Sequence, residues 1–513
     1  MMNVIDRLFE TAEKYPGNVA LADPVGSITY DELKNSVLKT ASYYLSGDNG
    51  VMLKASNCVA FFMEKCTKVV PLMFAAGYLG AFYSFIDIRQ PEERVNKILG
   101  LIRPVIIVTD AENYETLAKF NPSGVCDAQI VLIDDLCERV EQAKIDEQSI
   151  LEARKGFYDQ LPLYVNFTSG STGVPKGVVV AHRSVIDFID EFTRVFNITS
   201  TDIIANQAPF DFDVSVKDIY SGLFTGARVQ LIPRSYFSNP TTLMDYLDDN
   251  NVTTLIWAVS AMCFVSIMNG LEYRTPGSVN KVMFSGELMP VKQLNKWKKY
   301  IPNAMYVNLY GPTEITCNCT YYILDREFDK NEVIPIGTAF ANEKVFLLDE
   351  DDKLVCEPDT EGEICVSGTC LAIGYYKDPD KTAEVFVQNP LNSDYFERIY
   401  RTGDIGKYDA DGNLIYTSRK DFQIKHMGQR IELGDIEVAA MSIDGVSRAC
   451  CLYDHKHQKI ILFYTGDMGK EELSDEIRKL LPPFMIPAKT VKLDEFRMNK
   501  NGKIDRKVLE ELV

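Results

Sequence analysis

The strongest functional signal in the sequence is the stretch Thr168-Ser-Gly-Ser-Thr-Gly-Val-Pro-Lys-Gly177. It directly follows the apolar segment 163–167. Its three glycines allow a ligand to approach the backbone closely, and its hydroxyl groups and amides can donate hydrogen bonds to phosphate oxygens. It is not a Walker-type P-loop, because counting that pattern from Gly170 places Pro175 where glycine is required. A glycine- and serine-rich turn that binds nothing is the alternative. The composition, with Lys176 near the end, favours a polyphosphate-binding loop after a buried strand.

Helical and strand patterns alternate on both sides of this loop. Helices are expected over 6–20, 61–80, 241–251 and 290–301, and strands over 51–56, 81–87, 104–110, 129–135, 252–259 and 281–286. Such alternation predicts layered α/β subdomains with largely parallel sheets. After about residue 335, short strands joined by turns, for example at 344–354, 362–368 and 412–418, are typical of a β-rich subdomain.

The tail has a third pattern, in which strands and helices are mixed. A strand after residue 420 is followed by a helix over 434–442, strands over 448–454 and 459–465, a helix over 469–481 and a strand over 489–493. We therefore expect an α/β fold with a large core, residues 1–419, and a small mobile α+β domain, residues 420–513. The core would contain two layered α/β subdomains and the β-rich subdomain.

Composition excludes several classes of protein. The 513-residue chain is 46% hydrophobic and 25% charged, which is ordinary for a globular protein. Its net charge of −19 argues against nonspecific nucleic-acid binding, which requires neutralisation of phosphates, so we expect no nucleic-acid partner. The 12 cysteines are scattered without zinc-ligand spacing, and the N-terminus lacks an apolar signal core. These features predict a cytoplasmic protein with reduced thiols.

One segment has nearly the length of a membrane span. Residues 69–86 carry no charge, but they include Pro71 and two glycines, and Asp87 follows directly. A buried helix that leads into a buried strand is the expected structure, and no membrane span is expected.

Eight further motifs occur in order along the chain. They are ITYDEL (28–33), GAFYSFID (80–87), NLYGPTE (308–314), GEICVSG (362–368), YRTGD (400–404), SRKDFQIK (418–425), LPPFMIP (481–487) and NGKIDR (501–506). Together with the loop at 168–177, they resemble the adenylate-forming superfamily. NLYGPTE and NGKIDR are similar to the branch that activates amino acids, the adenylation enzymes of nonribosomal peptide synthesis.

The resemblance implies that the chain joins a carboxylate to the α-phosphate of ATP and expels pyrophosphate. Tyr310 would stack on adenine, Asp404 would bind the ribose, and Glu314 would hold Mg²⁺, a hard cation that prefers carboxylate oxygen. The implied ATP-binding residues are Thr168, Ser169, Gly170, Ser171, Thr172, Gly173, Lys176, Tyr310, Gly311, Thr313, Glu314, Asp404, Arg419 and Lys503. Among these, the implied catalytic residues are Lys503, Thr168, Lys176 and Glu314.

The segment 206–220 contains residues that would recognise the carboxylic acid substrate. Asp213 matches the position where enzymes for α-amino acids place a carboxylate against the substrate ammonium; the alternative is that it caps the following helix. By alignment, the pocket would be lined by Asp213, Val214, Lys217, Trp257, Met283, Ser285, Gly286, Leu309, Cys317 and Asn318. Because a lysine in a pocket needs a counter-charge, an acidic or polar amino acid such as glutamate or aspartate is one hypothesis. Alanine or another small amino acid is the other.

Parts of this segment, with FSGE (284–287) and DFQIK (421–425), look most like D-alanine–D-alanyl carrier protein ligases. Two residues depart from that group, in which a cysteine usually stands at Ser285 and an apolar residue at Lys217. Lys217 would point to solvent, or pair with Asp218 or Asp211, if it did not line the pocket.

The resemblance also implies a second half-reaction, in which the acyl group passes to a phosphopantetheine thiol. Rotation of the tail about Asp421 would remove Lys503 and bring Lys425 and Gly428 to the site, where Gly428 would let the pantetheine arm pass. No carrier segment is evident, so the expected partner is a separate carrier protein. Basic residues at 292–299 and 497–507 would dock such an acidic partner, although solvated surfaces are the alternative.

Two other functional classes remain open from the sequence. An acyl- or aryl-CoA ligase of the same superfamily would not need Asp213. A non-catalytic homologue would not need Lys503, Glu314 or the glycine-rich loop.

Overall fold

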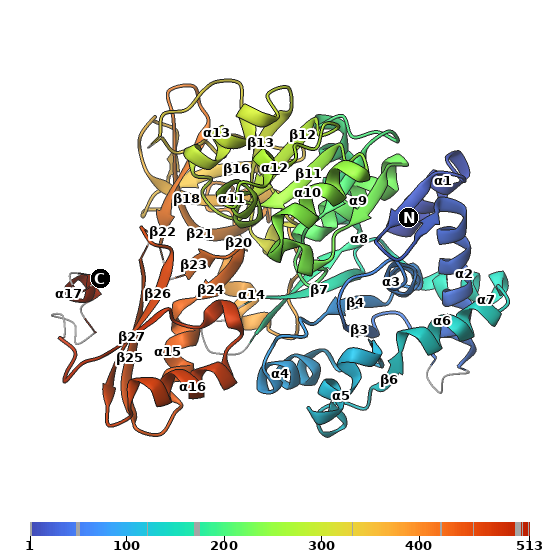
Figure 1. The fold of residues 1–513 in the computed structure, drawn as a ribbon, viewed down its shortest axis with the longest axis horizontal. Coiled ribbons are helices and arrows are strands. Elements are labelled where there is room, and N and C mark those ends of the chain that lie inside the picture. The colour runs from blue at the N-terminus through green and yellow to red at the C-terminus, as the bar shows by residue number, and fades with distance from the viewer. Residues whose placement is uncertain are drawn as a thin grey trace.

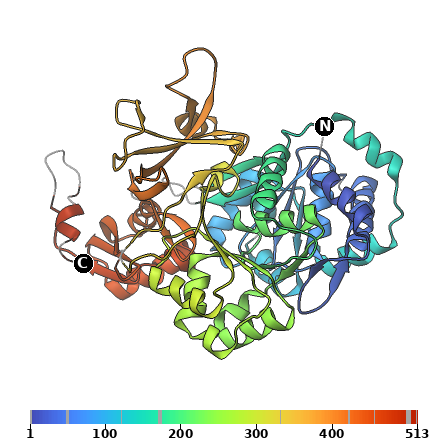
Figure 2. The same ribbon diagram turned by 90° about the horizontal axis from the view of Figure 1, so that it is seen from above.

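The computed structural model describes residues 3–47, 52–120, 122–168, 175–330, 332–420, 423–454, 456–497, 504, 506–510 and 512. These residues form sheets of nine, seven, six, three and two strands. The expected fold class is confirmed: a large α/β core carries a β-rich subdomain and is followed by a small α+β domain (Figure 1). Figure 2 shows this small domain, coloured red, at the opposite end of the molecule from the N-terminus.

The first layered subdomain is built on the seven-stranded sheet, in the order β19-β8-β7-β4-β3-β5-β6. Its strands are β3 (Cys58–Phe62), β4 (Phe82–Phe85), β5 (Ile106–Thr109), β6 (Gln129–Leu132), β7 (Pro162–Thr168), β8 (Lys176–Ala181) and β19 (Gly374–Tyr375). The helices of this part are α2 (Tyr30–Ser46), α3 (Val69–Tyr78), α4 (Glu92–Ile102), α5 (Ala111–Lys119), α6 (Ile133–Gln142) and α7 (Glu147–Ala153). The sheet is parallel from β7 to β6, as expected; β8 pairs antiparallel with both β7 and β19, so β8 is the one strand of this sheet that runs opposite to the others.

The second layered subdomain is built on the nine-stranded sheet, in the order β15-β14-β13-β12-β11-β9-β10-β1-β2. Its strands are β1 (Val19–Ala22), β2 (Ser27–Thr29), β9 (Ile203–Asn206), β10 (Arg228–Leu231), β11 (Thr254–Ala258), β12 (Lys281–Ser285), β13 (Met305–Tyr310), β14 (Thr320–Ile323) and β15 (Thr338–Ala339). Its helices are α1 (Val4–Lys14), α8 (His182–Val195), α9 (Val214–Thr225), α10 (Pro240–Asp249), α11 (Val259–Ile267), α12 (Gly270–Tyr273) and α13 (Val291–Tyr300).

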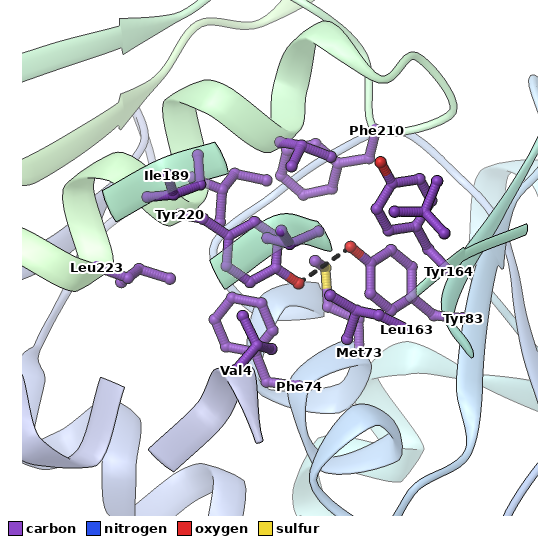
Figure 3. Packing of buried hydrophobic residues seen from close by; sticks show 14 of the residues in the cluster. Val4, Met73, Phe74, Tyr83, Leu163, Tyr164, Ile189, Phe210, Tyr220 and Leu223 are labelled. Carbon is purple, nitrogen blue, oxygen red and sulfur yellow. Dashed lines mark hydrogen bonds between the residues drawn. The ribbon is translucent and has the colours of Figure 1, made fainter. Parts of the chain in front are cut away.

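Two apolar helices, α3 and α9, lie in the interior that joins these subdomains. All ten residues of α3 are buried, which explains why this uncharged segment has no polar face. Phe74 of α3 contacts Tyr220 of α9 with ring centroids 5.5 Å apart, and the Tyr220 hydroxyl lies 3.1 Å from that of Tyr83 on β4 (Figure 3). The shared core fixes α9, and therefore Asp213 and Lys217, relative to both sheets.

The β-rich subdomain contains β16 (Glu343–Leu348), β17 (Leu354–Val355), β18 (Gly362–Gly368), β20 (Phe386–Gln388), β21 (Arg398–Tyr408) and β22 (Leu414–Arg419), with α14 (Pro379–Val385). The tail contains the hairpin β23 (Gln423–His426) and β24 (Gln429–Glu432), then α15 (Leu433–Met441), β25 (Val446–Asp454), β26 (Lys459–Gly466), α16 (Lys470–Leu480), β27 (Lys489–Lys492) and α17 (Arg506–Glu510). Arg419 thus ends the last core strand, and β23 starts a separate sheet. The boundary at 419/420 and the mobility of the tail stay predictions.

Three expected elements near the N-terminus are wrong in extent. The helix expected over 6–20 ends at Lys14, because Pro16 and Gly17 follow, and β1 begins at Val19. The expected strand at 51–56 is replaced by β3, Cys58–Phe62, which overlaps the helix expected over 61–80. That helix begins only at Val69. Short apolar runs do not distinguish a buried strand from a buried helix, which explains the error.

Among the described residues, no helix combines the length and the hydropathy that crossing a bilayer requires. The segment 69–86 forms α3 and β4 instead, as expected from its proline and glycines.

Candidate active site

The two ends of the glycine-rich loop lie next to each other. Thr168, the last residue of β7, pairs with Lys176, the first residue of β8. The Lys176 ammonium lies 3.8 Å from Oε1 of Glu432 in the tail and 5.7 Å from the centre of the Tyr375 ring. The predicted phosphate-binding residues between the strands lie outside the described residues; these are Ser169, Gly170, Ser171, Thr172 and Gly173.

Glu314 lies in a short turn just after β13, in the middle of the site. Its carboxylate is buried; Oε1 accepts a hydrogen bond of 2.8 Å from the Tyr375 hydroxyl, and Oε2 lies 2.7 Å from Nη1 of Arg430 in the tail. Burial alone would raise the pKa of Glu314, but the Arg430 charge and the Tyr375 hydrogen bond hold that pKa below its ordinary value. Both carboxylate oxygens of this predicted metal ligand are therefore occupied by partners in the described arrangement.

Close packing around residue 311 explains the glycine of the NLYGPTE motif. A Cβ on Gly311 would lie 2.5 Å from Cα of Asn318 and 2.6 Å from the Cys317 carbonyl oxygen, so no larger residue fits. The segment opposite is strained, because Thr316 and Cys317 have φ of 52° and 77°. This turn is what brings Cys317 and Asn318 back towards α9.

Asp404 on β21 joins the predicted adenine- and ribose-binding residues. Its buried carboxylate accepts a hydrogen bond from the Tyr310 hydroxyl through Oδ2 and one from Arg419 through Oδ1. Asp404 and Arg419 are direct partners across β21 and β22, so sheet register fixes this ion pair. The structure therefore brings together three side chains that the sequence predicted for one nucleotide.

Asp213 stands immediately before α9, at its N-cap position, but its side chain makes no capping hydrogen bond. Asp213 therefore does not form the side-chain hydrogen bond of an ordinary helix cap, and the Val214 N–H acts on its carboxylate instead. Burial raises the pKa of its carboxyl group, while a hydrogen bond with Thr313 and the charge of Lys217 act in the opposite direction. Cys317 donates its Sγ–H to the Asp213 carbonyl oxygen at 3.1 Å, which fixes the backbone here.

Lys217 lies one turn along α9 from Asp213, and its side chain is completely buried. Its ammonium donates to Oδ1 of Asn318 at 2.6 Å and to Oγ of Ser285 at 3.3 Å. Neither group carries a charge, and burial lowers the pKa of Lys217. Lys217 therefore does not point to solvent, and its hydrogen-bond partners are predicted pocket residues rather than Asp211 or Asp218.

The other predicted pocket residues are divided between the two faces of the nine-stranded sheet. Val214, Met283, Leu309 and Cys317 are buried, Met283 and Leu309 on the face that packs against α9, and Gly286 follows Ser285 with a φ of 98°. Trp257 does not belong with them: its indole donates to the Ala205 carbonyl oxygen at 2.9 Å and packs against Trp297 in the cluster on the opposite face. Because side chains alternate along a strand, placing Trp257 in this pocket was wrong by one position.

The β23–β24 hairpin of the tail brings two further predicted residues to the site. Lys425 lies 5.3 Å from the centre of the Tyr310 ring, and burial lowers the pKa of its ammonium. Gly428, with a φ of 76°, donates its N–H to Oε1 of Glu287 at 2.9 Å. A Cβ on Gly428 would lie 3.5 Å from both Ala258 and Ser260, so the hairpin tip touches the junction between β11 and α11.

Two predicted residues of the tail, Asp421 and Lys503, lie outside the described residues. Helix α17, which follows Lys503 in sequence, lies at the outer end of the molecule in both overall views, beyond β25 and β27 (Figures 1 and 2). It is fixed there by Arg506, which pairs with Glu437 of α15 at 2.6 Å. The described arrangement therefore presents the hairpin, and not α17, to the nucleotide residues.

Several residues that complete the site were not predicted from the sequence. They are Lys65, Glu287, Tyr375, Arg430 and Glu432. Arg430 and Glu432 follow the motif at 418–425 within a few positions, and this closeness was the available signal. Lys65 and Tyr375 carry no local signal, because only tertiary structure brings them to the site.

The chain matches the model of one protein family, described as AMP-binding enzyme, over residues 8–376. It is 30% identical over 500 residues to the L-proline–[L-prolyl-carrier protein] ligase of Streptomyces coelicolor, with 94% of this chain and 92% of that protein covered. It is also 30% identical over 516 residues to tyrocidine synthase 1 of Brevibacillus parabrevis, of which it spans only 45%. The solved structure of the Vibrio cholerae adenylation domain AlmE in complex with glycyl-adenosine-5'-phosphate has the same fold. Its TM-score is 0.84 at 21% identity, with 100% of this chain and 98% of that one covered.

Proposed function

Because the chain belongs to the AMP-binding enzyme family, we propose that it is an AMP-forming ligase for an amino acid and a carrier protein. In the first half-reaction, a carboxylate oxygen of the amino acid bonds to the α-phosphorus of ATP and pyrophosphate leaves. In the second, a phosphopantetheine thiolate attacks the acyl carbon and AMP leaves with the electron pair of the broken C–O bond. The observation that carries this proposal is the buried pair Asp213 and Lys217, which lies beside the nucleotide residues.

The nucleotide residues fit ATP and a divalent cation. Asp404 has two carboxylate oxygens that could accept from the ribose hydroxyls; in the described arrangement they accept from the Tyr310 hydroxyl and the Arg419 guanidinium. The Glu314 carboxylate is a hard oxygen donor whose pKa lies below its ordinary value, so it stays ionised and suits Mg²⁺. When bound, Mg²⁺ would neutralise phosphate charge. Arg430 would have to leave Glu314 for the cation to bind, because two positive charges repel each other at this distance.

The tail supports the second half-reaction in the described arrangement. Its strand β24 provides Arg430 to Glu314 and Glu432 to Lys176, so each group that would face the cation or the phosphates has an opposite charge beside it. This suits a state after pyrophosphate has left. Lys503 would act in the first half-reaction after the tail rotates about Asp421, and Gly428 would border the pantetheine path. The division into 1–419 and 420–513 is part of this proposal.

The amino-acid half of the site supports an α-amino acid over an aryl or fatty acid. A substrate without an ammonium group would leave the buried Asp213 carboxylate with only the Lys217 charge to offset its burial, which costs free energy. The same argument applies to Lys217, whose partners Asn318 and Ser285 are neutral. We therefore favour an amino acid with an acidic or strongly polar side chain over alanine, and both over the substrates of an acyl- or aryl-CoA ligase.

The proposed partner is a carrier protein with a phosphopantetheine arm. The named activity of the Streptomyces relative, of which the chain covers 92%, supports such a partner. Of the two basic segments, 292–299 forms most of α13 with Lys292 and Lys299 exposed, whereas most of 497–507 lies outside the described residues. Helix α13 is therefore the better supported docking element for an acidic carrier.

Amino-acid-dependent ATP–pyrophosphate exchange tests this function. We expect exchange with one or a few amino acids from a panel of both enantiomers of all the common ones, strongest with glutamate, aspartate or another polar side chain. Exchange with alanine alone would overturn the substrate class but keep the reaction. Exchange with no amino acid, together with thioester formation from an aryl or fatty acid and coenzyme A, would overturn the proposed function.

A further inference from the structure

Lys65 is a partly buried cation near the site whose ammonium contacts four oxygens. It follows β3 in the first layered subdomain, and its ammonium reaches across to the end of β9 in the second. It donates to Oδ1 of Asn206 at 2.7 Å and lies within 2.9, 2.9 and 3.0 Å of the carbonyl oxygens of Asn206, Gln207 and Ala208. An ammonium has three protons, so these four oxygens satisfy it completely. One side chain thus holds three consecutive backbone units of the segment that leads to Asp213.

Asn206 connects Lys65 to α9. Its amide oxygen accepts from Lys65, and its Nδ2 donates to Oδ2 of Asp218 at 2.7 Å. The positive group on one side and the carboxylate on the other fix the orientation of the amide. Burial lowers the pKa of Lys65 to about 7 and raises that of Asp218 to about 7, so the amide is held by the short distances of these two hydrogen bonds rather than by permanent charges. The chain Lys65–Asn206–Asp218 therefore joins the first subdomain to α9 at the residue next to Lys217.

The start of α9 shows why this connection matters for the site. Helix α9 begins at Val214, and the side chain of Asp213, the residue before it, makes no capping hydrogen bond. A helix start that lacks its cap loses about 1 kcal/mol of stabilisation. If the Asp213 carboxylate is reserved for a substrate ammonium, another contact must hold the segment 207–213 and the helix.

We propose that Lys65 is a positioning residue that holds the amino-acid-binding segment in place of the missing helix cap. Through the backbone of 206–208 it sets the position of Asp213, and through Asn206 and Asp218 it sets the position of Lys217. The role rests on the proposed amino-acid adenylation, but the physical connection can be tested without it.

Strand β9 offers a matched control, because a second lysine is bound at its other end. Lys281 donates to Oδ1 of Asp202 at 2.7 Å, just before β9 begins, and Asp202 is buried. Lys65→Met and Lys281→Met each remove one lysine that ties a neighbouring segment to β9. Of these two lysines, only Lys65 contacts the carboxyl end of β9, which leads to Asp213 and α9. Asp218→Asn provides a milder variant that keeps the shape of the side chain.

Amide hydrogen exchange on the full chain is the first measurement. Lys65→Met should lose protection over 207–221, Asp218→Asn should lose less in the same segment, and Lys281→Met should lose it near 202 and 281 but not over 207–221. Unchanged protection of 207–221 in both Lys65→Met and Asp218→Asn would overturn the proposal. This readout needs no substrate, so it stands even if the proposed function fails.

Exchange kinetics are the second measurement, made with whichever amino acid the wild-type chain activates. Lys65→Met should raise KM for the amino acid about 10-fold, the effect of leaving a buried hydrogen-bond acceptor without its donor, and leave KM for ATP within about twofold. Lys281→Met should change neither KM. Equal changes in both KM values, or the same change in Lys281→Met, would mean general destabilisation and would overturn the positioning role. Absence of exchange in the wild-type chain would instead refute the adenylation function.

Discussion

The nucleotide half and the amino-acid half of the site hold their buried charges in opposite ways. In the nucleotide half, Glu314 lies against Arg430 and Asp404 against Arg419, so each carboxylate has a guanidinium partner. In the amino-acid half, the hydrogen-bond partners of Lys217 are an amide and a hydroxyl. The charged groups of both halves are buried. The carboxylates of the nucleotide half lie in ion pairs, whereas Lys217 is hydrogen-bonded to neutral groups.

The difference indicates what each half binds. An ion pair that crosses the domain boundary, such as Glu314–Arg430, can be exchanged for a ligand of the same charge when the tail moves. A buried charge with neutral partners costs free energy until a ligand supplies the opposite charge. The nucleotide half is therefore suited to exchange during a cycle, and the amino-acid half to selection of a charged substrate.

Removal of the Asp213 charge should have the largest effect. In Asp213→Asn the substrate ammonium loses its buried counter-charge, a loss of about 3–5 kcal/mol that corresponds to at least a 100-fold fall in kcat/KM for the amino acid. ATP binding should not change, because the carboxylates of that half are intact. Amino-acid-dependent ATP–pyrophosphate exchange and calorimetric titration with a non-hydrolysable ATP analogue measure the two effects separately.

Asp211→Asn is the control in the same segment, since Asp211 lies two residues away and is predicted to contact neither the amino acid nor the nucleotide. We expect its kcat/KM to stay within about threefold of wild type, as is usual for a residue outside the transition-state contacts. Equal losses of kcat/KM in Asp213→Asn and Asp211→Asn would show that any charge change disrupts this segment. The proposed difference between the nucleotide half and the amino-acid half would then be wrong.

Local motifs made one part of this site predictable and left another part hidden. Tyr310, Gly311, Thr313 and Glu314 lie within five consecutive positions, so one motif located a strand end and its turn together. The contact between Lys217 and Asn318 spans 101 residues, and only the strained turn after Glu314 creates it. No pattern in either segment encodes that distance.

The remaining errors have physical causes of the same kind. Trp257 was placed in the pocket by alignment, but the alternation of side chains along β11 directs it to the other face of the sheet. The pairing of Arg430 with Glu314 depends on how the tail is oriented on the core, and local sequence carries no information on that orientation. The layered α/β core was predictable because its apolar helices and strands recur with a regular period.

Lys217→Met should have the second largest effect, and it should change preference more than rate. A methionine keeps the length and removes the charge, so discrimination between a preferred acidic amino acid and its neutral amide should fall about 30-fold. Exchange with an apolar amino acid of similar size should rise. A panel that compares glutamate, glutamine and methionine in both proteins measures this change. An unaltered order of preference would show that Lys217 only supports Asn318 and Ser285.

Arg430→Met should have a smaller effect, confined to the second half-reaction. It removes the partner of Glu314 in the described arrangement, so transfer to a phosphopantetheinylated carrier should slow about 10-fold, while exchange in the first half-reaction should be unchanged. Single-turnover thioester formation from preformed adenylate measures the first effect. Arg478→Met, which breaks an exposed pair on α16, is the control and should alter neither step. Slower exchange in Arg430→Met would show that this residue also serves adenylation.

The smallest predicted effect is a pH dependence of a few-fold that separates the two halves. Burial raises the pKa of Asp213, so as pH falls this carboxylate is protonated earlier than an ordinary aspartate and the ammonium loses its partner. Burial lowers the pKa of Lys217, so as pH rises its charge is lost earlier than that of an ordinary lysine. Affinity for an acidic amino acid should therefore fall on both sides of an optimum.

Glu314 behaves differently, because its pKa is held below the ordinary value and it stays ionised across the same range. KM for ATP should accordingly stay flat where kcat/KM for the amino acid follows a bell-shaped curve. In Lys217→Met the alkaline limb should disappear, and the acid limb should move to higher pH, because the Lys217 charge lowers the pKa of Asp213. Parallel pH profiles for ATP and the amino acid would mean that one titration governs the whole site, and the two halves would then not differ in how they hold charge.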